Sequence, residues 1–97
     1  MKKYELMTIY PIEEDKFKAG TDLVRSVLAQ FGATVEKEEP YGDRDLAYEI
    51  NKQKRGRFVL FTVSANPAKL VEINAQFRLN NNLLKSLFVK LDDEKNK

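Results

Sequence analysis

This chain of 97 residues contains no cysteine and no histidine. The absence of cysteine excludes disulfides, thiolate nucleophiles and cysteine-bound metals, and the absence of histidine removes the usual general base and the commonest transition-metal ligand. Glycine is scarce too, and its four copies at positions 20, 32, 42 and 56 are too scattered for a glycine-rich phosphate-binding loop. We therefore expect no enzyme activity, no cofactor, no metal and no small-molecule substrate.

Long apolar runs are absent as well, and residues 1–5 lead directly into a β-prone segment. From this pattern we expect no membrane span, no export signal and a cytoplasmic location. The composition, with 42% hydrophobic and 33% charged residues, is typical of a globular domain with one modest core. The net charge is only +2, so any contact with nucleic acid has to be local.

The first half of the chain predicts a strand, a helix and a second strand. Aromatic and β-branched residues fill positions 4–10, and Pro11 ends that strand because it lacks an amide donor. The helix is predicted by an acidic start at 13–15 and by apolar residues on one face: Phe17, Val24, Val27, Leu28 and Phe31. Gly20 weakens this helix, and Gly32 suits its end. Residues 33–50 predict a strand with a bulge or bend at 40–42.

The second half predicts a hairpin, a helix and a last strand. A basic loop at residues 52–56 precedes a third strand at 58–63, in which Val59, Phe61 and Val63 are the likelier core face. Asparagine and proline at 66–67 suit a helix start, and three asparagines at 80–82 suit its end. The apolar stripe of this helix is Leu70, Ile73 and Phe77. Residues 83–91 predict the last strand.

This order of strand, helix, strand, strand, helix, strand predicts an α+β fold of the ferredoxin-like, split βαβ type (βαββαβ). Residues 1–91 would form a single domain whose four-stranded antiparallel sheet carries both helices on one face, and residues 92–97 a short charged, solvated tail. The other face would be uncovered, with Phe58 and Leu60 directed outward, which predicts a partner that covers it. In the first and last strands the pattern leaves open which set faces the core: Leu6 or Met7, and Leu84 or Leu87.

The most distinctive cluster of side chains is basic, with Lys52, Lys54, Arg55 and Arg57 in and after the predicted loop. Clustered cations at a hairpin tip suit a phosphate backbone, but a loop whose charges merely face water explains them equally well. Carboxylates are plentiful, for example at 36–39, and none has the context that a metal site or an acid–base pair needs. We expect these carboxylates to be surface charges, with Glu36 and Glu38 on the same face of their strand.

The middle of the chain carries a more specific signal. Its motif consists of Gly42, Arg44, the triplet Leu46-Ala47-Tyr48, Ile50, Lys52, Gly56 and Phe58. Together with Phe31-Gly32-Ala33 and Val35-Glu36-Lys37, this motif resembles the bacterial ribosomal small-subunit protein six family, and the likeness covers nearly the whole chain. Two positions depart from the family pattern, since Asp45 replaces a usual basic residue and Glu49 a usual proline.

The resemblance implies a structural component of the small ribosomal subunit that has no enzyme activity. It implies binding to the central domain of small-subunit ribosomal RNA as a heterodimer with ribosomal small-subunit protein eighteen. With the basic cluster included, the expected RNA contacts are Lys2, Lys3, Tyr4, Arg44, Lys52, Lys54, Arg55, Arg57 and Lys85. The expected contacts with a protein partner are Tyr48, Phe58 and Leu60.

Two other functions remain open at this stage. Residues 58–61 match the Phe-Val-x-Phe of the RNA-recognition-motif signature, and this match favours a free-standing binder of single-stranded RNA. However, the signature also has an aromatic residue before the position of Phe58, and this chain lacks it. A regulatory ferredoxin-like dimer that binds a small ligand would have the same fold. The first would be identified if Phe58→Ala abolishes RNA binding while Lys52→Ala has little effect. The second would be identified if the pure protein is a stable dimer that does not bind RNA.

Overall fold

A computed structural model describes residues 1–91 and contains the expected order of elements. In chain order these are β1 (Lys2–Tyr10), α1 (Glu14–Gln30), β2 (Thr34–Ile50), β3 (Gln53–Ala65), α2 (Leu70–Arg78) and β4 (Lys85–Lys90), with a 3₁₀ turn at Pro67–Lys69 before α2. The predicted charged tail at 92–97 lies outside the described residues. The last strand is shorter than predicted, and the third strand is longer.

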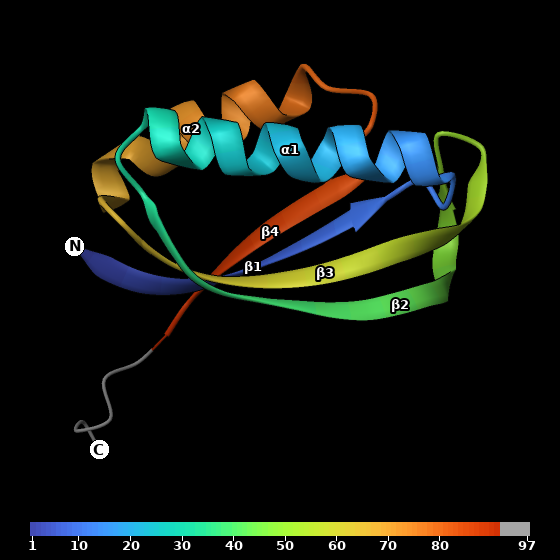
Figure 1. Cartoon of the computed structure of the whole chain (residues 1–97), viewed down its shortest axis with the longest axis horizontal. Coiled ribbons are helices and arrows are strands. Elements are labelled where there is room, and N and C mark those ends of the chain that lie inside the picture. The colour runs from blue at the N-terminus through green and yellow to red at the C-terminus, as the bar shows by residue number, and fades with distance from the viewer. Residues whose placement is uncertain (92–97) are drawn as a thin grey trace.

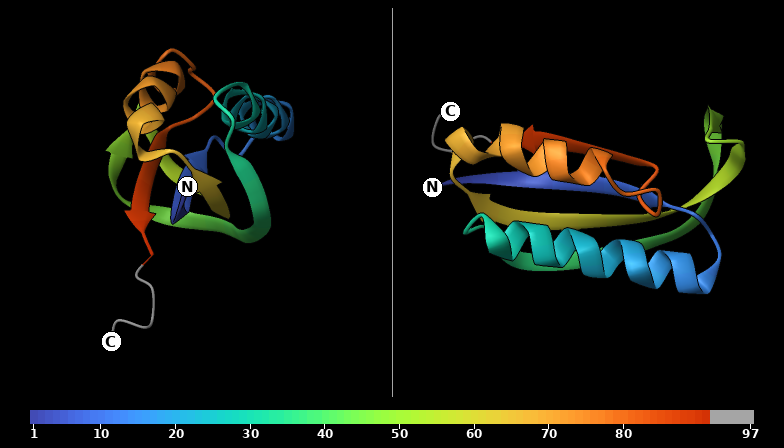
Figure 2. Two further views of the ribbon diagram at one scale, coloured as in Figure 1. Left: turned by 90° about the vertical axis from the view of Figure 1, so that its left-hand side faces the viewer. Right: turned by 90° about the horizontal axis from the view of Figure 1, so that it is seen from above.

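The four strands form one antiparallel sheet in the order β2-β3-β1-β4. Both helices lie on the same face of this sheet (Figure 1), and the view along the layers shows them packed side by side above it (Figure 2). This arrangement confirms the predicted ferredoxin-like fold. β1 is a central strand, whereas β2 and β4 are the two edges.

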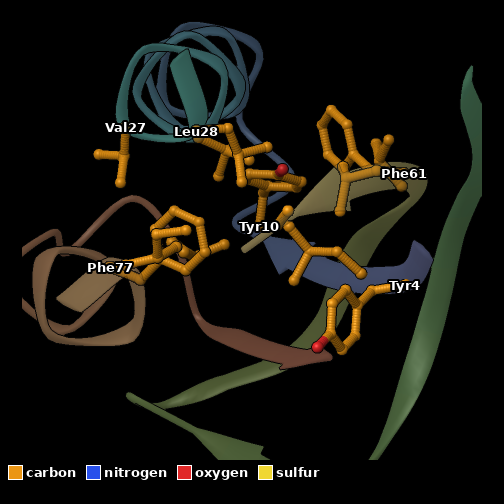
Figure 3. Close-up of a cluster of buried hydrophobic side chains, with 13 residues drawn as sticks. Tyr4, Tyr10, Val27, Leu28, Phe61 and Phe77 are labelled. Carbon is orange, nitrogen blue, oxygen red and sulfur yellow. The ribbon is translucent and has the colours of Figure 1, made fainter. Parts of the chain in front are cut away.

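The core lies between the sheet and the two helices, as Figure 3 shows for the side chains around Tyr10 and Phe61. The inward residues of β3 are those predicted, since Val59, Phe61 and Val63 are all buried. The predicted apolar stripes of the helices also face this layer, and their buried members are Val24, Val27, Leu28, Ile73 and Phe77. The apolar residues that repeat every two positions in the strands and every 3.6 positions in the helices therefore pack together in one core.

The structure resolves which faces of the first and last strands are buried. Leu6 is fully buried, so the even-numbered residues of β1 face the core and Met7 faces outward. In β4, Phe88 packs against the core, whereas Leu87 is 56% exposed. Met7 and Leu87 are paired across the two strands, so both lie on the face that the helices leave uncovered.

Small and capping residues set the ends and the closeness of the helices. Gly32, with a φ of +77°, follows the last turn of α1, and Asn66 caps the turn before α2, both as predicted. Gly20 lies where a Cβ atom would overlap the carbonyl oxygen of Asn82 and come within 2.6 Å of the Tyr10 ring. The glycine that weakens α1 as an isolated helix therefore allows α1 to pack closely in the fold.

The hairpin between β2 and β3 differs from the prediction. The predicted loop at 52–56 is wrong, because Ile50 pairs with Gln53 and the turn consists only of Asn51 and Lys52. Both turn residues have positive φ, 50° and 66°, as in the two-residue turns whose twist matches that of the flanking strands. Gly56 lies inside β3, where a Cβ atom would be 2.5 Å from the Ile9 side chain.

The far part of this hairpin, residues 43–56, is called the arm below. A register shift between Pro40 and Gly42 precedes it, and Gly42 has a φ of +80°, which confirms the predicted bulge. A second shift leaves four residues of β2, 46–49, opposite the single residue Lys54. These irregularities turn the arm out of line with the sheet (Figure 1), and the view from above shows it reaching toward the β4 side (Figure 2).

Candidate nucleic-acid interface

The tip of the arm carries two cations, Lys52 and Lys54, that have no partner within residues 1–91. Lys52 is the second residue of the turn, and Lys54 is the second residue of β3. Both side chains are exposed. Within residues 1–91, neither lysine makes an ion pair or a side-chain hydrogen bond. Their ammonium groups are therefore available to an anion such as a phosphate.

The remaining arm cations are engaged within the protein. The Nε atom of Arg55 lies 3.2 Å from a carboxylate oxygen of Asp45, the residue that departs from the family pattern. Arg44 donates from Nε to the Tyr41 carbonyl at 3.3 Å, and its guanidinium lies 5.8 Å from the centre of the Tyr41 ring. Both pairs are exposed, so an incoming phosphate can compete for these guanidinium groups at little cost.

Arg57 is held more firmly than any other predicted contact. Its Nη1 lies 3.0 Å from Glu14, its Nε 3.1 Å from Asp43, and the guanidinium covers the Phe17 ring at 4.4 Å. Hydrogen bonds to Glu14 and Asp43 raise the pKa of Arg57, so it remains charged. These contacts join β3, β2 and the start of α1, which makes Arg57 a clamp at the base of the arm. Its contact with RNA stays a prediction.

Lys85 and Tyr48 are brought together although 37 residues separate them in sequence. The Lys85 ammonium donates to the Tyr48 hydroxyl at 2.8 Å and lies 5.4 Å from the centre of that ring. This contact joins the irregular segment of the arm to the first residue of β4. Lys85 was predicted to contact RNA and Tyr48 a protein partner, and their contact with each other has no signal in the sequence.

The remaining predicted RNA contacts lie at the opposite end of β1. Lys2 and Lys3 are exposed, and the Lys3 ammonium lies 3.3 Å from Glu36. β1 runs from these lysines to Tyr10 beside the arm, a distance of roughly 25 Å for an extended strand. Tyr4 is only 5% exposed, and its ring packs edge-on against Phe88 in the core. Its side chain therefore contributes to packing in this structure.

The outward face of the sheet presents apolar side chains. Phe58 is partly exposed there, while Leu60, predicted to contact a partner, lies on this face but is only 9% exposed because Met7 and Glu39 flank it. The most exposed apolar residues of this face come from β4: Leu87, whose orientation the sequence left open, and Val89, which are 56% and 48% exposed. The alternation in β4 alone could not reveal them, because both of its faces carry apolar residues.

Two acidic residues of β2, Glu36 and Glu38, have hydrogen-bond partners within the fold. Glu36 accepts a hydrogen bond from Ser64 at 2.5 Å, and Glu38 accepts two from the Arg25 guanidinium at 2.8 Å each. The prediction that Glu36 and Glu38 share a face is wrong, because the register shifts between Val35 and Lys37. Hydrogen bonds from these partners lower the pKa of both carboxyl groups.

Two general properties of the described residues bear on function. Within residues 1–91, no group of three acidic side chains lies close enough to hold a metal ion. Neither helix in this part of the chain has the length and apolar character that a membrane-spanning helix needs.

Comparison with known proteins identifies the family. A family model described as ribosomal protein S6 matches residues 3–90. Small ribosomal subunit protein bS6 of Treponema denticola is 53% identical over 93 residues, which cover 96% of this chain and 100% of that protein. The bS6 protein of Treponema pallidum strain Nichols is 42% identical over 92 residues, covering 95% and 99%.

A solved structure shows the same fold. The crystal structure of 30S ribosomal protein S6 from Thermotoga maritima matches with a TM-score of 0.82 at 20% identity, over 93% of this chain and 87% of that one. Since the family model covers nearly all of the sequence and the relatives align over their full length, this chain belongs to the ribosomal protein S6 family.

Proposed function

We propose that this chain is a structural component of the small ribosomal subunit. In this role it binds the central domain of small-subunit ribosomal RNA together with ribosomal small-subunit protein eighteen, and it catalyses no reaction. Family membership supports the ribosomal setting. The observation that supports RNA contact is the pair of cations at the tip of the arm, Lys52 and Lys54, which have no partner in the part of the chain that the structure describes.

The backbone at Lys52 strengthens this assignment. Its φ of 66° lies in the left-handed region, which costs a non-glycine residue about 1–2 kcal/mol. Glycine is the preferred second residue of such a turn, so the position holds a lysine at the expense of stability. Strained residues are often found at functional sites, so a strained lysine at the turn favours a contact between Lys52 and an external anion.

The small net charge of the chain and the exposed apolar face of its sheet both favour binding together with a second protein. A net charge of +2 gives weak attraction to a polyanion, so a partner has to supply part of the positive surface. The outward face, with Leu87 and Val89 exposed, offers an apolar surface that protein eighteen would cover. A stacking platform for single-stranded RNA is less well supported, because Phe58 is the one aromatic residue that β1, β3 and β4 direct to this face.

RNA binding by gel shift tests the proposal directly. The RNA is the central domain of small-subunit ribosomal RNA, and it is titrated at two salt concentrations with this protein, with protein eighteen, and with both. We expect tight binding only with both proteins, and a steep loss of affinity at the higher salt because counterions are released on binding. If this protein adds nothing to binding by protein eighteen, the proposal is wrong.

The variant Lys52→Gly separates the turn's function from its stability. We expect a free energy of unfolding about 1 kcal/mol higher, because glycine relieves the positive φ, together with weaker RNA binding by the protein pair. The slope of log affinity against log salt should fall by about one, the value for one lost phosphate contact. The matched control is Lys18→Gly on the exposed face of α1, which should lower stability and leave the slope unchanged. An unchanged slope in Lys52→Gly would remove Lys52 from the interface.

A further inference from the structure

A pocket with unusual chemistry lies where the tip of the arm meets the start of α1 and the loop between α2 and β4. Its volume is about 330 Å³, and its polar lining consists of Lys16, Asn51, Gln53, Asn81 and Asn82. Pro11 and Leu84 supply the apolar part of the lining. Three segments that are distant in sequence therefore converge at one end of the molecule, the end where α1 begins (Figure 2).

The pocket contains amides and one cation but no carboxylate. By contrast, several cations elsewhere in the fold are paired with acids, such as Arg55 with Asp45 and Lys3 with Glu36. Within residues 1–91, none of the five polar side chains of the pocket makes a hydrogen bond or an ion pair inside the protein. The four side-chain amides can donate and accept hydrogen bonds, which suits a neutral group that does both. The lysine ammonium suits an anionic group on the same ligand.

The pocket is formed by ordered backbone. Gly20 lets α1 approach the carbonyl of Asn82, and the Asn82 amide donates to the Asn80 side chain at 2.8 Å. The Leu84 amide then donates to the Ile9 carbonyl at 2.7 Å, which ties the loop to the end of β1. The loop side of the pocket is thus fixed by contacts independent of any ligand, so little ordering is needed on binding.

We propose that this pocket binds one unstacked nucleotide, whose base edge is held by the amides of Asn51, Gln53 and Asn81 and whose phosphate is held by Lys16. Asparagine and glutamine read the donor and acceptor pattern of a base edge, and RNA is read mainly through unstacked bases. A volume of about 330 Å³ is at the small end of ligand pockets and suits one nucleotide. Pro11 and Leu84 offer apolar surface to the base.

The position of the pocket agrees with the function proposed above, on which the identification of the nucleotide as part of RNA rests. Lys52 lies between two lining residues, Asn51 and Gln53, in the chain. A strand whose phosphates contact Lys52 would pass the mouth of the pocket and could place one flipped base in it. The arm would then contact phosphates regardless of the RNA sequence, and the pocket would make one contact that depends on the identity of the base.

The test is titration of the ¹⁵N-labelled protein with each of the four nucleoside monophosphates and, separately, with inorganic phosphate, followed by side-chain amide resonances. We expect saturable shifts at Asn51, Gln53 and Asn81 with at least one nucleotide, and affinity at least tenfold weaker in a Gln53→Ala, Asn81→Ala double variant. The control Gln30→Ala changes an exposed amide at the other end of α1 and should bind normally. Absence of saturable shifts with every nucleotide, or equal shifts with phosphate alone, would overturn the proposal.

The gel shift described above keeps the two proposals separate. If nucleotides bind the pocket but the central-domain RNA is not bound, the pocket stands and the proposed binding to that RNA is wrong. If RNA binding depends on Lys52 but no nucleotide shifts the pocket amides, the ribosomal role stands and the pocket is excluded as a base-binding site.

Discussion

At the scale of single residues, Gly20 shows how tertiary packing overrides helix propensity. Alanine at this position would favour the isolated helix by about 1 kcal/mol. In the fold, its methyl group would overlap the backbone carbonyl of Asn82 and press on the rigid ring of Tyr10, and neither group can move away cheaply. Overpacking of this kind costs about 1–3 kcal/mol, so the clash outweighs the gain.

We therefore predict that Gly20→Ala lowers the free energy of unfolding, as measured by urea denaturation. Ser26→Ala is the matched control, because Ser26 is exposed on the same helix and alanine should there raise stability by a few tenths of a kcal/mol. Equal stabilisation by both changes would show that α1 does not pack against the loop between α2 and β4 as closely as described.

At the scale of elements, a side-chain contact between Tyr48 and Lys85 adds to the attachment of the arm at its base. Arg57 holds the base, and the Tyr48 hydroxyl and ring hold Lys85 at the start of β4. Tyr48 is 59% exposed, so this contact contributes little to global stability. Its effect is to restrict where the arm can lie.

We predict that Tyr48→Ala increases amide hydrogen exchange in residues 43–56 several-fold, while the global free energy of unfolding falls by less than about 1 kcal/mol. Tyr41→Ala is the control, because Tyr41 is also an exposed tyrosine beside a cation, but that cation is Arg44 of the arm itself and not a residue of β4. If exchange in the arm stays unchanged in Tyr48→Ala, the contact with Lys85 does not restrain the arm.

The elements also show what the sequence could and could not predict. Strong periodicity predicted both helices, the order of the strands and the inward set of β3, because burial repeats every two or 3.6 residues. The predicted loop at 52–56 is wrong, because Gly56 and its basic neighbours have the composition of a loop, whereas Gly56 lies in β3 and permits the close approach of Ile9. The pairs Tyr48 with Lys85 and Arg57 with Glu14 depend on how the bulges turn the arm, which local pattern does not specify.

At the scale of the whole molecule, an ion pair connects the helix layer with the sheet and gives stability a pH dependence. Arg25 of α1 donates two hydrogen bonds to Glu38 of β2, and these bonds lower the pKa of the Glu38 carboxyl in the folded state. A carboxyl whose pKa is lower in the folded than in the unfolded chain stabilises the fold above the unfolded value of about 4.3. That contribution is lost as the pH falls through the folded pKa.

We predict that Glu38→Gln lowers the free energy of unfolding by about 0.5–1 kcal/mol at neutral pH, a small value because both partners are partly exposed. The difference from the unchanged protein should shrink toward zero as the pH falls below about 4. Denaturation curves across this range measure it, with Glu49→Gln as a control that lacks an ion pair within residues 1–91. A loss that does not depend on pH would mean that charge is not its cause.

The strand order has a consequence for how the chain folds as it is synthesised. β1 emerges first, yet its two neighbours in the sheet are β3 and β4, so that Leu6 pairs with Phe61 on one side and with Phe88 on the other. The hairpin of β2 and β3 can form while translation continues, but β1 keeps one unpaired edge until the last strand has been made. The nascent chain therefore cannot close its sheet before β4 has been made, and until then the unpaired edge of its central strand is a place where misfolding or aggregation can begin.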